Sequence, residues 1–590
     1  RKSRADDDPL PPTLPWTTPA KTAVYCPVRH EAENRSIGDR TMERRNFMRK
    51  AALGAAGIGL LSSARDASGA GLRQGDRPNV LFVWTDEQIF GMLSCEGNPH
   101  IRTPHLDRLA DEGVMFTNCF CTWPSCSPSR ATVITGAYAF NHRLVDNIHE
   151  DIGFEGLKPF DGYKITQQHL QEAGYAIGHQ GKWHIGRKKD WGSCFTADPG
   201  YSERYSPTWV REHKAEILET YPWDAETRTG KGGYVKGKTL LPTKLTPSWR
   251  KAFDRKRHPN WAIVGRMLTP PEKTMEHAIV DDTIRFIERH KDGPPWMTTL
   301  SLSPPHDPWS VPEPYYSEIA EPLMKTLTFE GKSVEEEQRS SLSWRVGQLV
   351  DDQGIADYMA IYHAQVKMMD DFIGRVLAVL DEHDLTRNTL VVFTSDHGDM
   401  VGLHRNVGKI NNNLYNRLFH TPCLIRYPKG VRGGQVIDKP VMHTDFLPTI
   451  LDYAGRVPPA TIDGRSLRPL MEGNPTDWRD YHLLEKHRNV VRNPDHSIRN
   501  DDDFYWAMGL EDGRYKYITT RWNHPRKNRK YCGPRFIDLQ KDPHEETNLF
   551  DHPDYRERVK AYHRKLYRVL KESGFPQIAE YDSDPWSTRM

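Results

Sequence analysis

The sequence predicts an α/β protein, with a large domain built on a central, mostly parallel sheet flanked by helices and a smaller C-terminal α+β unit. Residues 80–84 are a continuous apolar run, and residues 296–302 and 389–394 are further segments that we expect to be strands buried in a parallel sheet. Residues 276–290 and 357–382 show the apolar spacing of helices that pack on a core.

The composition is that of a globular protein whose recognition sites are local. The chain has 590 residues, of which 37% are hydrophobic and 10% aromatic. Lys and Arg number 81 against 79 Asp and Glu, so no global field favours nucleic acid or an anionic membrane. The 8 cysteines are too few for a disulfide scaffold, and we expect most of them to be buried thiols.

The first 70 residues are predicted to lie outside the folded domain. Residues 1–41 are polar and Pro-rich, which indicates disorder or an extension upstream of the true start. Residues 42–70 contain paired arginines, a short apolar run and Ser68-Gly69-Ala70, the pattern of a twin-arginine signal peptide. A short buried helix is the alternative. We expect export to the periplasm or beyond without stable insertion in a membrane, because spanning one needs about 20 apolar residues.

The first strand ends in two acids, and a helix with a reactive residue follows. Asp86 and Glu87 stand where open α/β sheets place their ligands, although a solvated loop or a helix cap is the alternative. Thr103-Pro104 predicts a helix start, and residues 114–116 a strand that leads to Cys126.

Cys126 opens the motif Cys-Ser-Pro-Ser-Arg-Ala, which is followed by Thr135-Gly136. Its chemistry suits a thiol activated at a helix N-terminus, with Arg130 one turn further on. A lone Cys-x-Pro-x-Arg would be a weak signal because most cysteines are simply buried, but the longer motif is much more specific.

Basic groups follow the next predicted strands. A helix at residues 166–173 and a strand at 175–178 lead into Lys182 and His184, which project from one face of an extended segment. A cation beside an imidazole suits binding an anion and moving a proton. His306 stands in Pro-Pro-His-Asp-Pro after the strand at 296–302.

Asp396 and His397 come directly after the strand at 389–394. They can join Asp86 around one metal ion if their strands are neighbours, as a parallel sheet allows. Oxygen ligands favour Ca²⁺ or Mg²⁺ over zinc, and one imidazole leaves Mn²⁺ open. Lys409 lies in the loop before the strand at 423–427, where a surface lysine is the alternative.

At these motifs the chain resembles the sulfatase family of the alkaline-phosphatase-like superfamily, over nearly all of residues 78–550. The resemblance implies an alkaline-phosphatase-like catalytic domain at 71–478 and a C-terminal α+β subdomain with an antiparallel sheet at 479–590. It also implies that a formylglycine-generating enzyme oxidises Cys126 to formylglycine, whose hydrated aldehyde supplies the attacking hydroxyl beside one calcium ion.

The resemblance further implies a role for each site residue. Arg130 would hold the hydroxyl and the metal loop, and Lys182 and Lys409 would neutralise sulfate oxygens. His306, with Lys409, would protonate the departing alcohol, and His184 would take a proton from the second hydroxyl. Glu87 stands where the family usually has an aspartate. The implied metal ligands are Asp86, Glu87, Cys126, Asp396 and His397.

We therefore expect hydrolysis of a sulfate ester, with two other functions left open. A phosphonate monoester or phosphodiester hydrolase would use the same cationic groups to bind a tetrahedral oxyanion. A protein that binds sulfated glycan without turnover would result if Cys126 is never oxidised.

An aromatic and basic insertion at residues 190–270 suggests a sulfated carbohydrate substrate. Its aromatic rings can stack on sugars in a cleft, or its tryptophans can anchor a surface excursion. The basic run at 526–530 is a further candidate to reach this cleft. The aromatic and basic residues of the insertion are Trp209, Trp223, Trp249, Trp261, Arg211, Lys236, Lys244, Arg250 and Arg257.

Overall fold

A computed structural model describes most of the chain after its first 76 residues. The predicted disordered segment, the signal peptide and the basic run at 526–530 lie outside the described residues, as do Trp209, Trp223, Trp261, Arg211, Lys236 and Arg257. The described residues are 77–148, 162–186, 243–252, 263–329, 346–409, 414–474, 477–488, 491–492, 498–499, 504–523, 533–576, 578–581 and 585–586.

The large domain is organised around a seven-stranded sheet with the strand order β12-β2-β11-β9-β1-β7-β4. β1 pairs in parallel with both β7 and β9, and β4 pairs in parallel with β7, while β11 runs antiparallel between β9 and β2. The predicted central, mostly parallel sheet is thus confirmed. The strands are β1 (Asn79–Asp86), β2 (Val114–Phe116), β4 (Ala176–Gly181), β7 (Trp296–Pro305), β9 (Thr389–Ser395), β11 (Cys423–Arg426) and β12 (Gln435–Ile437).

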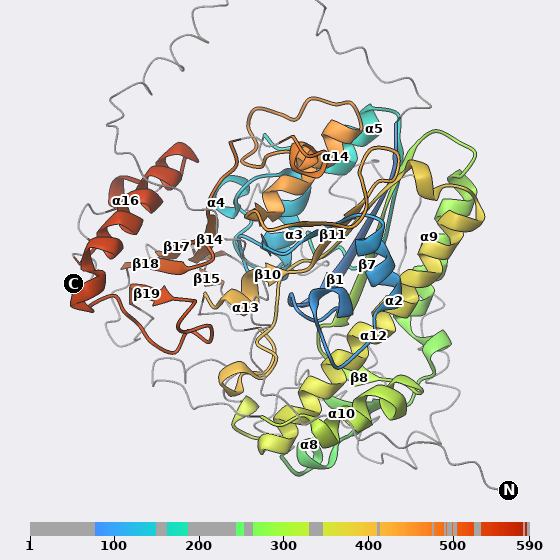
Figure 1. The fold of residues 1–590 in the computed structure, drawn as a ribbon, viewed down its shortest axis with the longest axis horizontal. Helices are drawn as coiled ribbons and strands as arrows, with labels where there is room; N and C mark the ends of the chain where they lie inside the picture. The colour runs from blue at the N-terminus through green and yellow to red at the C-terminus, as the bar shows by residue number, and fades with distance from the viewer. Residues whose placement is uncertain are drawn as a thin grey trace, which may run out of the picture. The chain divides into compact units, whose positions relative to one another are not determined.

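Helices cover both faces of this sheet (Figure 1). The alternation of side chains along β1 sends Leu81 and Val83 to one face and Val80 and Phe82 to the other. Helices α2, α9 and α12 pack on the first face, and α3, α5 and α14 on the second. Their bounds are α2 (Pro104–Asp111), α3 (Cys126–Thr135), α5 (Thr166–Glu172), α9 (Met275–His290), α12 (Asp352–Glu382) and α14 (Phe446–Tyr453).

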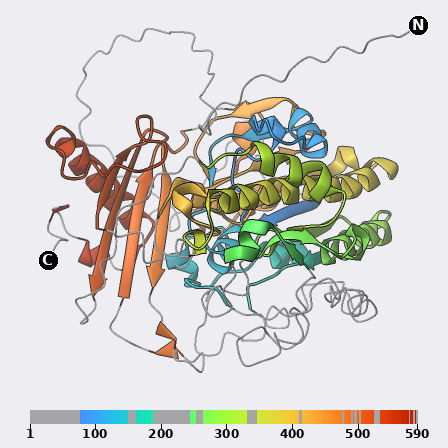
Figure 2. The ribbon, with the colours of Figure 1, turned by 90° about the horizontal axis from the view of Figure 1, so that it is seen from below.

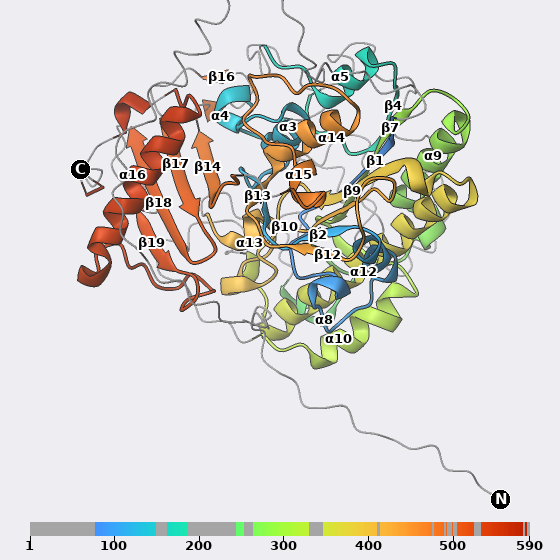
Figure 3. The ribbon, with the colours of Figure 1, turned by 45° about the horizontal axis from the view of Figure 1, so that its top comes forward.

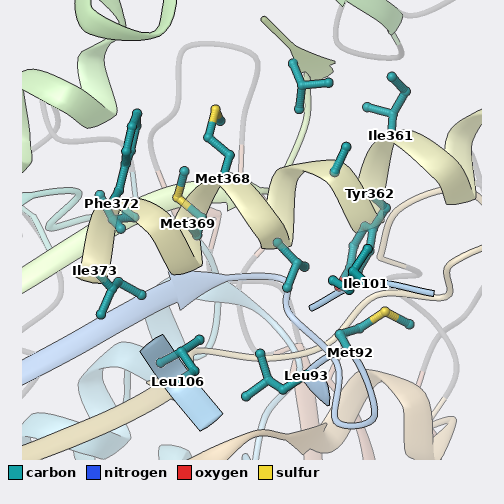
Figure 4. Packing of buried hydrophobic residues seen from close by; sticks show 14 of the residues in the cluster. Met92, Leu93, Ile101, Leu106, Ile361, Tyr362, Met368, Met369, Phe372 and Ile373 are labelled. Atoms are coloured by element: carbon teal, nitrogen blue, oxygen red, sulfur yellow. The ribbon is translucent and has the colours of Figure 1, made fainter. Parts of the chain in front are cut away.

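The longest helix, α12, forms much of the core on the first face (Figure 4). It begins a few residues before the prediction because the Asp351 side chain caps it, accepting a hydrogen bond from the Gly354 amide at 2.9 Å. Its apolar residues meet Met92, Leu93 and Ile101, which are buried in the segment between β1 and α2, and Leu106 in α2 itself. The helix residues labelled there are Ile361, Tyr362, Met368, Met369, Phe372 and Ile373.

Part of the insertion predicted at 190–270 has regular structure, as β5 (Thr243–Leu245), α8 (Pro247–Ala252) and β6 (Val264–Met267). Trp249 is fully buried, and its Nε1 donates a hydrogen bond to the Gly354 carbonyl at 2.7 Å. Of the two roles left open for the insertion's tryptophans, Trp249 fits the anchor, because its ring is packed against the start of α12 and cannot stack on a sugar. Lys244 and Arg250 are exposed.

The C-terminal part forms a four-stranded antiparallel sheet of order β14-β17-β18-β19, drawn in orange to red in Figure 2. Helix α16 (Arg556–Glu572) packs on one face of it (Figure 3). The predicted α+β unit with an antiparallel sheet is confirmed, whereas its boundary near 479 stays a prediction. The strands are β14 (His482–Arg488), β17 (Phe504–Glu511), β18 (Tyr515–Asn523) and β19 (Arg535–Asp538).

A buried ion pair joins this sheet to the segment that follows Lys409. Lys516 of β18 contacts the Leu414 carbonyl and pairs with Glu545 at 2.7 Å, and both charged side chains are at most 3% exposed. The other oxygen of Glu545 accepts from the Asn416 amide at 2.6 Å. The C-terminal sheet therefore holds the chain just beyond a predicted site residue.

No helix among the residues that the structure describes combines the length and the apolarity needed to cross a membrane.

We expect Lys516→Met to reduce the free energy of unfolding by about 3–5 kcal/mol, because it leaves the Glu545 carboxylate buried without its partner. Urea unfolding followed by tryptophan fluorescence measures the loss. The matched control is Lys164→Met, whose ion pair with Glu172 is about half exposed, at 55% and 48%, and should cost at most about 1 kcal/mol. Equal losses in the two variants would contradict the prediction.

Candidate active site

The carboxyl ends of three neighbouring strands bring two predicted acids and two histidines together. Asp86 is the last residue of β1, Asp396 and His397 follow β9, and His306 follows β7. Because β1 lies between β7 and β9 in the sheet, these residues meet at one edge. The predicted metal site required the strands before Asp86 and Asp396 to be neighbours, and they are.

Cys126 is placed beside them by the N-terminus of α3, of which it is the first residue. The serines of its motif hold the helix in place. Ser129 Oγ contacts the carbonyl oxygen of Asp396, and Ser127 Oγ donates to the carbonyl oxygen of His184 at 2.6 Å. The side chain of residue 126 is therefore fixed relative to both adjoining loops, and it is 1% exposed.

The carboxylates of Asp86 and Asp396 divide their oxygens between two kinds of partner. Both Oδ1 atoms lie near His397 Nε2, at 4.0 and 3.8 Å, and Cys126 Sγ is 3.7 Å from Asp86 Oδ1 and 3.4 Å from His397 Nε2. Both Oδ2 atoms face Arg130 instead, at 3.2 Å from Asp86 and 2.8 Å from Asp396. The Oδ1 atom of each acid is thus directed toward His397, and Arg130 neutralises the Oδ2 atom of each.

These four residues fit a metal ion. All four are buried, and their ligand atoms lie within 4.8 Å of one another. His397 Nδ1 lies 2.8 Å from the Gly398 carbonyl, which fixes the proton on Nδ1 and directs the Nε2 lone pair at the cluster. Two carboxylates and one imidazole are ligands for a hard cation such as Ca²⁺, Mg²⁺ or Mn²⁺.

The Arg130 guanidinium is bound by other groups of the protein. Besides the two carboxylates, it donates to the Lys182 carbonyl at 2.8 Å and to Ser301 Oγ at 2.9 Å, and its guanidinium lies 4.7 Å from the centre of the Trp84 ring. With its side chain fully buried, Arg130 holds the two acids in position.

Two lysines approach Cys126 from different loops. Lys182 Nζ is 3.6 Å and Lys409 Nζ is 3.5 Å from Cys126 Sγ, and each also pairs with an acid, Asp86 and Glu87 respectively. Burial raises the pKa of the Cys126 thiol, but Lys182, Lys409 and His397 outweigh burial and hold this pKa well below its usual range. The pocket around residue 126 therefore favours an anion.

The two histidines at the pocket have opposite acid–base character. Burial lowers the pKa of His184, and Lys182 lowers it further. Burial also lowers the pKa of His306, but the carboxylates of Asp307 and Glu87 outweigh burial and raise it to about 10. At neutral pH His184 is a proton acceptor and His306 a proton donor, the arrangement expected of a base and an acid in one site.

Glu87 is not one of the four residues that fit a metal ion, but it forms a second possible metal-binding group with Asp86 and His306. Its Oε1 contacts Lys409 Nζ and is 3.4 Å from His306 Nε2, and the residue adopts a left-handed backbone with φ 66°. Its Oε2 is buried without a hydrogen bond among the described residues. Its amide also donates to Asp396 Oδ1 at 3.2 Å, and its ligation of an ion stays a prediction.

The sequence prediction did not include Ser301 or Asp307. Ser301 supports Arg130 from β7, and the Asp307 carboxylate is 3.1 Å from His306 Nδ1. Asp307 was visible as the neighbour of a predicted site histidine. Ser301 carried no signal, because only the pairing of β7 with β1 brings it near α3.

Known proteins resemble this chain over most of its length. The Sulfatase family model matches residues 78–456, and the model "N-sulphoglucosamine sulphohydrolase, C-terminal" matches residues 411–572. The multifunctional alkaline phosphatase superfamily protein PehA of Trinickia caryophylli is 28% identical over 546 residues, covering 86% of this chain and 98% of that protein. An N-acetylglucosamine-6-O-sulfatase of Bacteroides thetaiotaomicron is 27% identical over 553 residues, covering 86% and 88%.

Solved structures share the fold. The phosphonate monoester hydrolase of Agrobacterium radiobacter has a TM-score of 0.61 at 24% identity, covering 84% of this chain and 96% of that one. A protein solved with its substrate D-glucosamine-2-N,6-O-disulfate has a TM-score of 0.57 at 21% identity, covering 86% and 100%. Since the family model spans more than half of the sequence, the chain is a sulfatase enzyme and belongs to the sulfatase family of the alkaline-phosphatase-like superfamily.

Proposed function

We propose that this sulfatase hydrolyses a sulfate ester of a carbohydrate, with a formylglycine made from Cys126 and one bound calcium ion. The observation that carries the proposal is the convergence of Lys182, Lys409 and His184 on the buried Cys126 side chain at a helix N-terminus, with His306 next to Lys409. A sulfate ester needs this combination, because its oxygens are negative and its leaving alcohol requires a proton.

Residue 126 would be the nucleophile. Formylglycine, as its hydrate, supplies a hydroxyl group that can attack sulfur. Because Cys126 is buried in the folded chain, a formylglycine-generating enzyme has to act on it before folding is complete. This order agrees with export of the folded protein by the twin-arginine route to the periplasm or the extracellular space, as residues 42–70 suggest.

Asp86, Asp396 and His397 would hold the calcium ion, with Mg²⁺ or Mn²⁺ as the alternatives. The ion supplies positive charge next to the oxygen of residue 126, where the thiol sulfur of Cys126 now stands. Arg130 holds the carboxylates of Asp86 and Asp396 in position. Whether Glu87 adds a ligand depends on its release from Lys409.

The remaining groups would bind the sulfate and move protons. Lys182 and Lys409 are within reach of an anion at residue 126, and their ammonium groups would offset its charge in a buried site. His306, whose Nε2 is 3.1 Å from Lys409 Nζ, would protonate the leaving oxygen. His184 would accept the proton of the second hydroxyl when the aldehyde is restored.

The named substrates of similar proteins support a carbohydrate. One relative is an N-acetylglucosamine-6-O-sulfatase, and one solved structure holds a disulfated glucosamine. The near-neutral charge of the chain, +2, argues against nucleic acid as a partner.

A phosphonate monoester or phosphodiester hydrolase is the second candidate, since a multifunctional member of the superfamily is 28% identical. We expect the purified enzyme to prefer 4-nitrophenyl sulfate to 4-nitrophenyl phenylphosphonate in kcat/KM. Both esters release the same nitrophenol, so one absorbance assay compares them directly. A large preference for the phosphonate would make the second candidate the function of the chain.

The peptide containing Cys126 should be about 18 Da lighter than its unmodified form when the protein is produced with a formylglycine-generating enzyme, because an aldehyde replaces the thiol group. Mass spectrometry of the tryptic peptide measures this. Cys126→Ala should abolish turnover, while Cys121→Ala, which also removes a buried thiol, should retain it. An unmodified Cys126 would instead support a glycan-binding protein without activity.

Chelation with EDTA should lower both the melting temperature and the rate, and calcium should restore them. Ligand at a hundred times its Kd stabilises a fold by about 2.7 kcal/mol. Asp396→Asn should abolish the calcium-dependent shift in melting temperature. Asp371→Asn, which changes a separate group of His105, Asp370 and Asp371, should retain it; the opposite pattern would place the ion there.

A further inference from the structure

The ring of His306 has a different type of partner at each nitrogen. Nδ1 lies 2.8 Å from the backbone carbonyl of Asp307 and 3.1 Å from its carboxylate oxygen Oδ1. Nε2 lies 3.1 Å from Lys409 Nζ and 3.4 Å from Glu87 Oε1, on the side of Cys126. One nitrogen therefore faces the residue that follows it in sequence, and the other faces the reaction site.

The partners of Nδ1 determine which nitrogen exchanges a proton with a substrate. A carbonyl and a carboxylate accept hydrogen bonds and cannot donate them, so Nδ1 keeps its hydrogen. Nε2 is then the nitrogen that gains or loses the second proton, and it points into the site. In the Ser-His-Asp triad a carboxylate on the far side of the imidazole plays this part.

Asp307 is well placed to hold the ring still. Its side chain is only 18% exposed, and the backbone is fixed on both sides. The His306 amide donates to the Ser303 carbonyl at 3.1 Å, and β8 (Trp309–Val311), which begins with the fully buried Trp309, pairs with β6. The carboxylate therefore belongs to a rigid corner between two strands.

We propose that Asp307 is a positioning residue for the general acid, holding His306 with Nε2–H directed at the leaving oxygen. The proposal rests on the proposed sulfatase function. It makes Asp307 most important for alcohols that leave poorly, such as the hydroxyls of a sugar, because these need a full proton as the ester bond breaks. A nitrophenol leaves as a stable anion and needs little help.

Two other roles for Asp307 make different predictions. If its carboxylate binds a sugar hydroxyl, its loss raises KM for carbohydrates and leaves simple alkyl and aryl sulfates unaffected. If it only supports the loop, its loss lowers the rate on every substrate by a similar factor.

The test compares kcat for substituted phenyl sulfates of increasing phenol basicity and for a simple alkyl sulfate, in the wild type, Asp307→Asn and Asp307→Ala. We expect both variants to lose about 100-fold in kcat on the alkyl sulfate and less than about threefold on 4-nitrophenyl sulfate, with KM little changed. The dependence of kcat on phenol pKa should steepen. Glu313→Gln, an exposed acid beyond β8 that pairs with Arg266, is the matched control and should resemble the wild type.

A second readout separates positioning from structure. In a His306→Gln background, Asp307→Asn should have no further effect on the alkyl sulfate, because the group that Asp307 positions is absent. An equal loss on all esters, a change confined to KM, or full additivity with His306→Gln would overturn the role of Asp307 while the sulfatase function stands. A wild type that turns over no sulfate ester would overturn the proposed function, and this role with it.

Discussion

The site depends on the buried ion pairs that Arg130 makes with Asp86 and Asp396. Two carboxylates taken out of water so close together repel one another and lose their hydration, which is costly unless a cation compensates for it. Arg130 neutralises one oxygen of each acid, at 3.2 and 2.8 Å, and leaves the other oxygen of each directed at the point shared with His397 and Cys126. The candidate metal site and the proposed nucleophile thus both depend on one arginine, which is placed by α3.

Two further ion pairs balance the charge around Cys126. Lys182 pairs with Asp86 and Lys409 with Glu87, yet both ammonium groups remain within 3.6 Å of Cys126 Sγ. An arriving sulfate would meet these lysines already held in position, so that little reorganisation is needed at the moment of reaction. The Lys409 loop is in turn followed by residues that the C-terminal sheet holds through Lys516 and Glu545. The smaller unit therefore contributes to the order of the site.

The sequence alone predicted the buried strands, the main helices and nearly all of the polar side chains that meet in the site. This was possible because apolar runs and helical spacing are local patterns, and because polar residues that follow buried strands have few structural roles. Cys126, Lys182 and His306 lie far apart in the chain, but each stands at an end of an element that the pattern identifies. Two roles stayed open for Trp249 because composition does not tell a buried anchor from an exposed ring, and its burial favours the anchor.

Only the tertiary structure decided how these residues divide their contacts. The pairing of β1 with β7 and β9 brought the strand ends together, and no local sequence pattern predicts that pairing. The tertiary structure showed that Arg130 pairs with both acids, that Glu87 lies beside Lys409 and His306, and that the Asp307 carboxylate is 3.1 Å from His306 Nδ1. Residue types and spacing in the sequence determined which chemistry was available. Distances between atoms of separate loops depend on how the chain packs. These distances therefore decided which atom each charged side chain of the site contacts.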